Sequence, residues 1–274
     1  MPESILQDVG PIIDESLGLK DRGIGREPHY HHKETCQKLG ASAPLTFDAK
    51  VLIEKIYGKV LSNWKEGIHC RLSKQNWRFK SFPTIAENNG DPEIKLERAI
   101  VRIQGTPINW ANQVPTSSGL LGQHADKHRN IDLIHQCEDG AYELIELKVE
   151  SNTPLYAAME ILQNAVLYIF YRERKKELEV KVREPKPILE ARVLHLRVLA
   201  PCRYYEGYKL AWLEANICKG LSAYLATKMP DLQIDFRFDA FPPWFTVKDC
   251  REIASKDHDD SIRKAVDDRK PVYS

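Results

Sequence analysis

Hydrophobic residues along this chain recur with two periods, that of an α-helix and that of a β-strand. Spacings of three and four residues predict helices over 47–64, 92–103, 154–176 and 204–229. Alternation and short apolar runs predict strands over 131–137, 141–149 and 188–201, with further strands at 71–82, 109–114 and 232–247. Because strands and helices alternate along the chain, the pattern indicates an α/β fold.

Residues suited to helix ends support three of these helices. Asp48 is placed to cap the first helix, and Pro92 stands in the first turn of the second. Pro154 takes the same place in the third helix, where residues 151–153 supply capping oxygens. These starts agree with the hydrophobic spacing that follows each of them.

The length of 274 residues suits one sizeable domain with extensions. Residues 1–45 mix Gly, Pro, His and charged residues without periodicity, so we expect an N-terminal extension there. The domain itself is predicted over residues 46–250, with its core in 92–200. The charged residues 251–274 are expected to form a tail or a surface helix.

Composition adds limits on partners and location. Hydrophobic residues make up 42% of the chain and charged residues 29%, which is typical of a folded globular protein. A net charge of +1 gives no global field toward nucleic acid, so such binding requires a local patch of charge. No stretch reaches the ~18 apolar residues of a membrane span, and the N-terminus lacks a signal sequence. We therefore expect a cytoplasmic protein without a membrane partner.

The stretch IDLIHQCEDGAYELIELKVE, residues 131–150, reads as a β-hairpin with acids where core residues are expected. If residues 138–140 form a three-residue turn with Gly140 at positive φ, the numbers of paired residues sum to 278. Asp132 then lies opposite Glu146. A two-residue turn at 139–140 would instead set Asp132 opposite Leu147 and separate the two acids.

Strand periodicity places Glu146 and Lys148 on one face of the hairpin and Leu147 on the other. Two facing carboxylates repel each other unless a positive charge lies between them, and a hard divalent cation would supply it. Lys148 would be placed to hold an anion or orient a water. The alternative is an ordinary surface hairpin with an acidic exposed face.

With these residues the chain resembles the PD-(D/E)XK nuclease superfamily, whose fold is restriction-endonuclease-like. The resemblance covers residues 92–200: a helix with Glu97, a strand near 110, Asp132, Glu146-Leu147-Lys148, a helix and a strand. It implies an α/β core of order αβββαβ, with a central mixed sheet flanked by helices. Two features depart from the family: Ile131 replaces the proline before Asp132, and Glu93 competes with Glu97 for the helix position.

The resemblance implies Mg²⁺- or Mn²⁺-dependent hydrolysis of phosphodiester bonds. Asp132, Glu146, the backbone carbonyl of Leu147 and Glu97 would bind the metal, and Lys148 would position or activate the nucleophile and balance the charge of the transition state. Nucleic acid is the expected partner, DNA before RNA, with contacts from four further residues: Lys127, Arg129, Gln163 and Tyr168. The family's helical Gln and Tyr stand one turn apart, whereas Gln163 and Tyr168 are five residues apart.

Other interpretations stay open at this point. The chain could be a catalytically inactive member of the same fold that binds nucleic acid or protein, and it could form a homodimer. A zinc protein is a third hypothesis. Two groups of potential ligands suggest it: the histidines at 29 and 31–32 with Cys36, and His124 with His128. Neither group completes a four-ligand zinc set.

Overall fold

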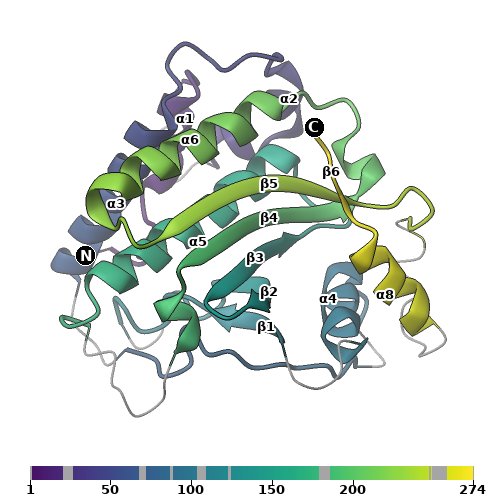
Figure 1. Cartoon of the computed structure of the whole chain (residues 1–274). Helices are drawn as coiled ribbons and strands as arrows, with labels where there is room; N and C mark the ends of the chain where they lie inside the picture. Colours follow the sequence, from purple (N-terminus) through teal and green to yellow (C-terminus); the bar gives the residue numbers. More distant parts are fainter. Residues whose placement is uncertain are drawn as a thin grey trace.

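One six-stranded mixed sheet organises the protein (Figure 1). The structure is a computed structural model that describes residues 2–20, 27–67, 72–86, 89–103, 109–122, 125–178, 186–246, 248 and 258–273. Across the sheet the order is β1 Trp110–Pro115, β2 Asn130–Glu138, β3 Ala141–Leu147, β4 Val193–Pro201, β5 Gln233–Phe241 and β6 Lys270–Pro271. Strands β3, β4 and β5 are parallel, whereas the pairs β1–β2, β2–β3 and β5–β6 are antiparallel.

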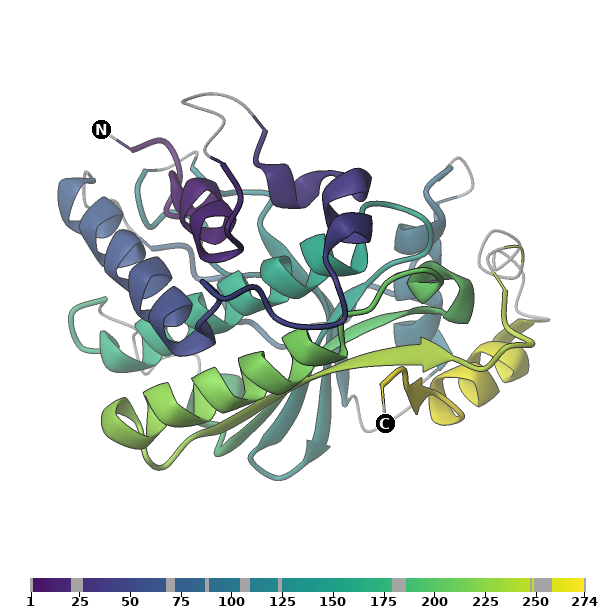
Figure 2. The same ribbon diagram turned by 90° about the horizontal axis from the view of Figure 1, so that it is seen from above.

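Helices cover both faces of the sheet, which confirms the predicted α/β class. One core unites the sheet with α1 Val9–Ser16, α2 Lys33–Lys38, α3 Ala49–Glu66, α5 Pro154–Glu173 and α6 Ala211–Lys228. A smaller core on the opposite face joins it to α4 Pro92–Ile103 and α8 Asp259–Asp267, which lie together in Figures 1 and 2. Among the described residues, no helix is long and apolar enough to cross a bilayer.

The three helix starts predicted from capping residues agree with the structure. Asp48 caps α3, because its Oδ1 accepts a hydrogen bond from Val51 N at 3.1 Å. Thr153 caps α5 through a 3.2 Å bond from Tyr156 N, and α4 begins at Pro92. The fourth predicted helix begins later than expected, at Ala211, after a 3-10 turn over Cys202–Tyr205.

The prediction of a strand over 71–82 is wrong, because the described residues 72–82 form turns and extended chain without strand pairing. The chain reverses at Trp77, which adopts a left-handed φ of 58° and is fully buried. Its indole packs edge-on against Tyr168 and Tyr171, at centroid distances of 5.5 and 5.6 Å. Burial of this large ring offsets a backbone conformation that alternation cannot anticipate.

Structure begins earlier than the predicted extension of residues 1–45 allows. Ile5, Val9 and Ile13 are buried in the larger core, and α1 packs on α3. The segment is also held by polar contacts: the backbone N–H of Ile5 donates to Asp126 Oδ2 at 2.9 Å. At the other end of the chain, the charged tail supplies α8 and the edge strand β6.

Helices α3 and α6 pack against each other at an angle (Figure 2), and their close approach at the start of α3 depends on a glycine. A Cβ added at Gly220 would lie 2.6 Å from Ala49 Cβ and 2.7 Å from backbone atoms of α3. We expect Gly220→Ala to lower the free energy of unfolding by about 1–3 kcal/mol, measured by urea denaturation, since the helices must separate.

Gly58 provides the matched control for this prediction. It is an exposed glycine in α3, and an added Cβ would contact nothing within 4 Å. Gly58→Ala should raise stability by roughly 0.5–1 kcal/mol through helix propensity alone. Equal effects at Gly58 and Gly220 would contradict the close packing of α3 on α6.

Candidate functional site

The hairpin of β2 and β3 sets the positions of the candidate residues. The numbers of paired residues sum to 278 from Leu133↔Ile145 to Gln136↔Tyr142. The predicted three-residue turn over 138–140 is wrong: Glu138 pairs with Ala141, a sum of 279, which leaves a two-residue turn at 139–140. A bulge at Cys137 absorbs the difference and restores the sum of 278. Gly140 has a φ of 76°, as predicted. Extended by one pair, the register sets Asp132 opposite Glu146.

The two faces of β3 belong to two different cores, as the alternation predicts. Ile145 and Leu147 pack with α4 and α8, while Leu144 packs in the larger core with α5. Glu146 and Lys148 therefore point to the side of α5, and both are buried, with 2% and 6% exposure. A charged pair at such depth requires compensation from its neighbours.

Lys148 is the centre of this compensation. Its Nζ lies 2.6 Å from Glu146 Oε1 and 3.4 Å from Glu160 Oε2 on α5. The negative charges of Glu146, Glu160 and Asp132 raise the pKa of Lys148 well above its usual value, against the effect of burial. The ammonium is therefore protonated at any physiological pH and acts as a fixed positive charge.

Asp132 joins this group from β2. Its Oδ2 accepts a hydrogen bond from the backbone N–H of Leu147 at 2.9 Å, which ties the two strands together at the site. Burial raises the pKa of Asp132 to about 6, while Lys148 and the Leu147 N–H lower it. Burial also raises the pKa of Glu146, and the charge of Asp132 raises it further. The two acids thus repel each other, as expected from the register.

Helix α4 contributes two more acids. Glu97 is buried and accepts hydrogen bonds from the side-chain amides of Asn112, at 2.6 Å, and Gln113. Burial, followed by the charge of Asp132, raises the pKa of Glu97 to about 8. Glu93, the alternative helix position, instead accepts from Val149 N at 3.0 Å and Ser151 Oγ at 2.5 Å, so it holds the chain just after β3.

One acid of the cluster keeps a free oxygen. Glu146 Oε2 is buried without a hydrogen-bond partner among the described residues, whereas Glu160 Oε2, which also lacks a hydrogen bond there, forms the 3.4 Å ion pair with Lys148. No three of the carboxylates lie within 4.8 Å of one another there, and Lys148 separates Glu146 from Glu160. Mg²⁺ and Mn²⁺ prefer oxygen ligands, and Mg²⁺ is commonly held by one or two carboxylates plus waters, so the donor set fits such an ion.

Two residues of the cluster escaped the sequence prediction. Glu160 is the only charged residue between Pro154 and Tyr171, a signal that could have identified it. Tyr204, in the 3-10 turn after β4, has a buried hydroxyl without a hydrogen-bond partner in the described part of the chain. Burial raises the pKa of Tyr204 and the charge of Lys148 lowers it. Nothing in the sequence around Tyr204 indicates this neighbourhood.

The four predicted nucleic-acid contacts lie in two different environments. Lys127 is exposed and Arg129 half-buried in the loop that leads into β2, with Arg129 Nε 3.8 Å from Asp126 Oδ1. Gln163 is on α5, and its side-chain amide donates to Met159 O of the same helix at 3.0 Å. Tyr168 is fully buried, and its hydroxyl donates to Ile188 O at 2.7 Å.

Position along α5 separates Tyr168 from the cluster. It lies eight residues beyond Glu160, which corresponds to about 12 Å of helix. Asn164, which has the family's spacing to Tyr168, is buried and accepts a 3.4 Å bond from Thr116 Oγ1. Asp132, Glu146 and Lys148 are thus brought together, and Glu97 on α4 is near enough to feel the charge of Asp132. Tyr168 belongs instead to the core around Trp77.

The histidines considered for zinc do not form a metal-binding group. Among the described residues, no group of three potential ligands includes the 29–32 segment or Cys36. His31 Nδ1 instead lies 3.2 Å from Glu27 Oε1, and Cys36 is fully buried. His124 lies outside the described residues.

Comparison with protein-family models, with curated proteins and with solved structures finds no match to this chain. The account of function consequently depends on the geometry of the cluster itself.

The charge balance around Lys148 predicts a pH-dependent loss of stability in Lys148→Met. Without the ammonium, buried carboxylates lack a partner, and unfolding at pH 8 should become easier by about 3–5 kcal/mol. The acids already have raised pKa values, about 6 for Asp132 and about 8 for Glu97, so the folded state retains protons that the unfolded state loses near pH 4. Stability therefore falls as pH rises through this window, more steeply in the variant.

Urea denaturation at pH 5 and pH 8 measures this effect. Lys264→Met is the control, since the side chain of Lys264 is 65% exposed and pairs with Asp268 one turn away. It should change stability by no more than about 0.5 kcal/mol at either pH. A loss in Lys148→Met that is equal at both pH values would contradict the proposed charge balance.

Proposed function

We propose that the protein is a divalent-metal-dependent nuclease built on a restriction-endonuclease-like core of the PD-(D/E)XK type. The observation that carries the proposal is the convergence of Asp132 on β2 with Glu146 on β3 and Lys148 just after it. A buried Glu146 oxygen there has no hydrogen-bond partner among the described residues. Structural ion pairs normally satisfy such oxygens, whereas an ion-binding site leaves them available.

The order of elements supports the same proposal. From α4 onward the chain forms a helix, three strands, a helix and a strand, namely α4, β1, β2, β3, α5 and β4. This is the αβββαβ order that the resemblance implies for the core. The acid on α4, the acid on β2 and the Glu-x-Lys on β3 occupy corresponding places in that order.

Each residue would have a definite task. Asp132 and Glu146 would hold Mg²⁺ or Mn²⁺, with the Leu147 carbonyl and Glu97 as further oxygen donors. The ion would supply Lewis acidity toward the phosphate and lower the pKa of a bound water. The neighbouring carboxylates raise the pKa of Lys148 against the effect of burial, and this favours the protonated ammonium. Lys148 would orient the nucleophilic water and stabilise negative charge on the phosphate, while Glu160 restrains its ammonium.

DNA is the proposed substrate, with RNA as the second case. The net charge of +1 offers no general attraction to a polyanion, so binding would depend on local cations. Lys127 and Arg129 lie in the loop before β2, five and three residues before Asp132. They are the proposed contacts to the nucleic-acid backbone. Gln163 stands one turn beyond Glu160 on α5, closer to the cluster than Tyr168.

Incubation with single- and double-stranded DNA and RNA tests this activity. Wild-type protein should cleave at least one of these substrates with Mg²⁺ or Mn²⁺ and none of them with a chelator. Asp132→Asn, Glu146→Gln and Lys148→Ala should each reduce the rate by on the order of 10²-fold or more, since each removes charge that acts in the transition state.

Lys264→Met, far from the cluster in sequence and exposed, is the control and should cleave at the wild-type rate. Equal cleavage by wild type and Lys148→Ala would indicate a contaminant and refute the catalytic assignment. Binding of nucleic acid without cleavage, with no response to Mg²⁺, would favour an inactive binding module.

Metal affinity should depend on pH with a definite sign. Asp132 has a pKa of about 6 and Glu97 of about 8, and a cation binds only their ionised forms. The increase in melting temperature caused by Mg²⁺ should therefore be small at pH 5.5 and grow up to pH 8.5, measured by scanning fluorimetry. In Asp132→Asn the Mg²⁺ effect should be largely lost, and an undiminished effect there would place the ion elsewhere.

A further inference from the structure

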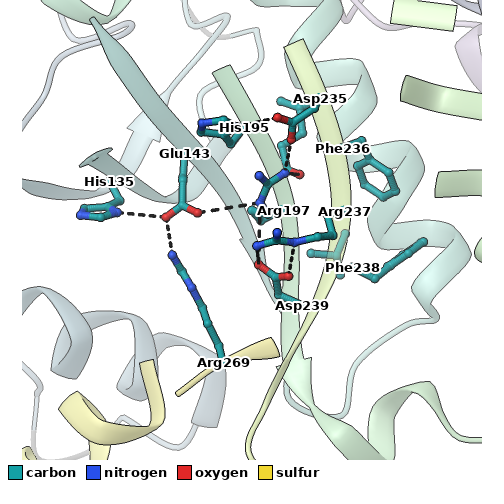
Figure 3. Close-up of polar contacts among 12 residues, drawn as sticks. His135, Glu143, His195, Arg197, Asp235, Phe236, Arg237, Phe238, Asp239 and Arg269 are labelled. Carbon is teal, nitrogen blue, oxygen red and sulfur yellow. Dashed lines mark hydrogen bonds and ion pairs between the residues drawn. The ribbon is translucent and has the colours of Figure 1, made fainter. Parts of the chain in front are cut away.

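A second group of potential ligands lies on the opposite face of the same hairpin (Figure 3). The register that pairs Asp132 with Glu146 also pairs His135 with Glu143. His135 Nδ1 lies 2.9 Å from Glu143 Oε2 and 3.6 Å from Cys137 Sγ. One ligand atom from each of the three residues lies within 4.8 Å of the other two.

These separations suit a small ion bound by nitrogen, sulfur and oxygen. Zinc bonds of about 2.0–2.3 Å at tetrahedral angles place neighbouring ligand atoms roughly 3.3–3.8 Å apart. The two measured separations differ from this range by a few tenths of an ångström at most. The third separation, between Cys137 and Glu143, is within 4.8 Å, so side-chain rotation would be needed to bring all three atoms onto one ion.

The backbone and an aromatic neighbour fix the group. Cys137 is the extra residue of the bulge in β2, and bulges commonly re-aim a side chain next to a functional site. The imidazole of His135 stacks on Trp110, with centroids 4.3 Å apart and planes inclined by 16°. Its other nitrogen, Nε2, lies 3.4 Å from Asn109 Nδ2. An Nε2–H needs an acceptor, so the Asn109 amide would turn by 180° and present Oδ1 to a metal-bound ring, in the way that outer partners orient metal-binding histidines.

The three potential ligands differ in exposure, and an ion bound by them would be accessible to solvent. Glu143 is buried, His135 is half-buried and Cys137 is exposed. A bound ion would have three protein ligands and a fourth position open to water or another ligand. This is the arrangement of exchangeable or catalytic zinc sites rather than of closed structural ones.

Cationic neighbours act against this site. Arg269 NH2 lies 2.5 Å from Glu143 Oε2, and Arg197 Nε lies 3.8 Å from Glu143 Oε1. Arg197 also pairs with Asp235, at 2.5 Å, and Figure 3 shows Arg269 reaching the Glu143 carboxylate from below, between His135 and Arg197. Arg197 has other acidic partners, so the guanidinium of Arg269 is the group that an ion would displace from the carboxylate.

We infer that His135, Cys137 and Glu143 form a binding site for a borderline divalent cation of the zinc class. Thiolate and imidazole ligands select such ions, whereas carboxylate and carbonyl oxygens suit Mg²⁺ and Mn²⁺. The two faces of one hairpin would then bind different metals, because their ligands differ in chemistry. On binding, the Cys137 thiol loses its proton to solvent, and His135 coordinates through Nδ1 while its remaining proton is on Nε2.

Zinc titration of the full-length protein, followed by calorimetry, tests the inference without reference to nuclease activity. We expect about one zinc ion per chain, with affinity that increases with pH because a thiol proton is released. His135→Ala and Cys137→Ser should each weaken binding by more than about 100-fold, since changes even outside the ligand shell cost about 10- to 100-fold. With Co²⁺, wild type should show thiolate-to-cobalt absorption that Cys137→Ser lacks.

Two further variants sharpen the outcome. His195→Ala is the matched control, because His195 occupies the next strand on the same face but pairs with Asp235. It should bind zinc like wild type. Arg269→Gln removes the competing guanidinium and should tighten binding several-fold. Absence of zinc binding, or binding that survives loss of both His135 and Cys137, would overturn the inference, and no tightening in Arg269→Gln would contradict the proposed exchange.

Discussion

The register of the β2–β3 hairpin determines the chemistry on both of its faces. Side chains alternate along a strand, so a shift of one residue would exchange every core position for a polar one. The turn pair Glu138↔Ala141 alone would produce such a shift, and the bulge at Cys137 cancels it. With the register restored, Asp132 faces Glu146 on one side, and His135 pairs with Glu143 on the other.

Burial of charge on the α5 side has a cost that the fold offsets only in part. Lys148 is paired with Glu146 and Glu160, yet Glu146 keeps one buried oxygen without a hydrogen bond among the described residues. Replacing such a cluster by apolar residues is often neutral or stabilising. The cluster therefore adds little to the stability of the fold. Stability alone does not explain why the chain keeps it, and a functional role would.

Local patterns anticipated much of this arrangement. Helix α4 spans the predicted residues, and the predicted sum of 278 holds from Leu133↔Ile145 to Gln136↔Tyr142. It arises from a two-residue turn and a bulge, not from the predicted three-residue turn. The failures come from tertiary contacts: burial of Trp77 overrides strand alternation, and the N-terminal segment acquires structure by packing on α3. Glu160 joins the cluster only because α5 crosses β3, a relation that spacing within one element cannot express.

Crystals soaked in Mn²⁺ and measured at its absorption edge would test the central claim most directly. Anomalous scattering locates the ion independently of any assumption about function. The account predicts one strong peak within coordination distance of Asp132 and Glu146 oxygens, about 2.0–2.6 Å, on the α5 side of the hairpin. A wild-type crystal with no peak there, or with Mn²⁺ bound only at other acids, would contradict it.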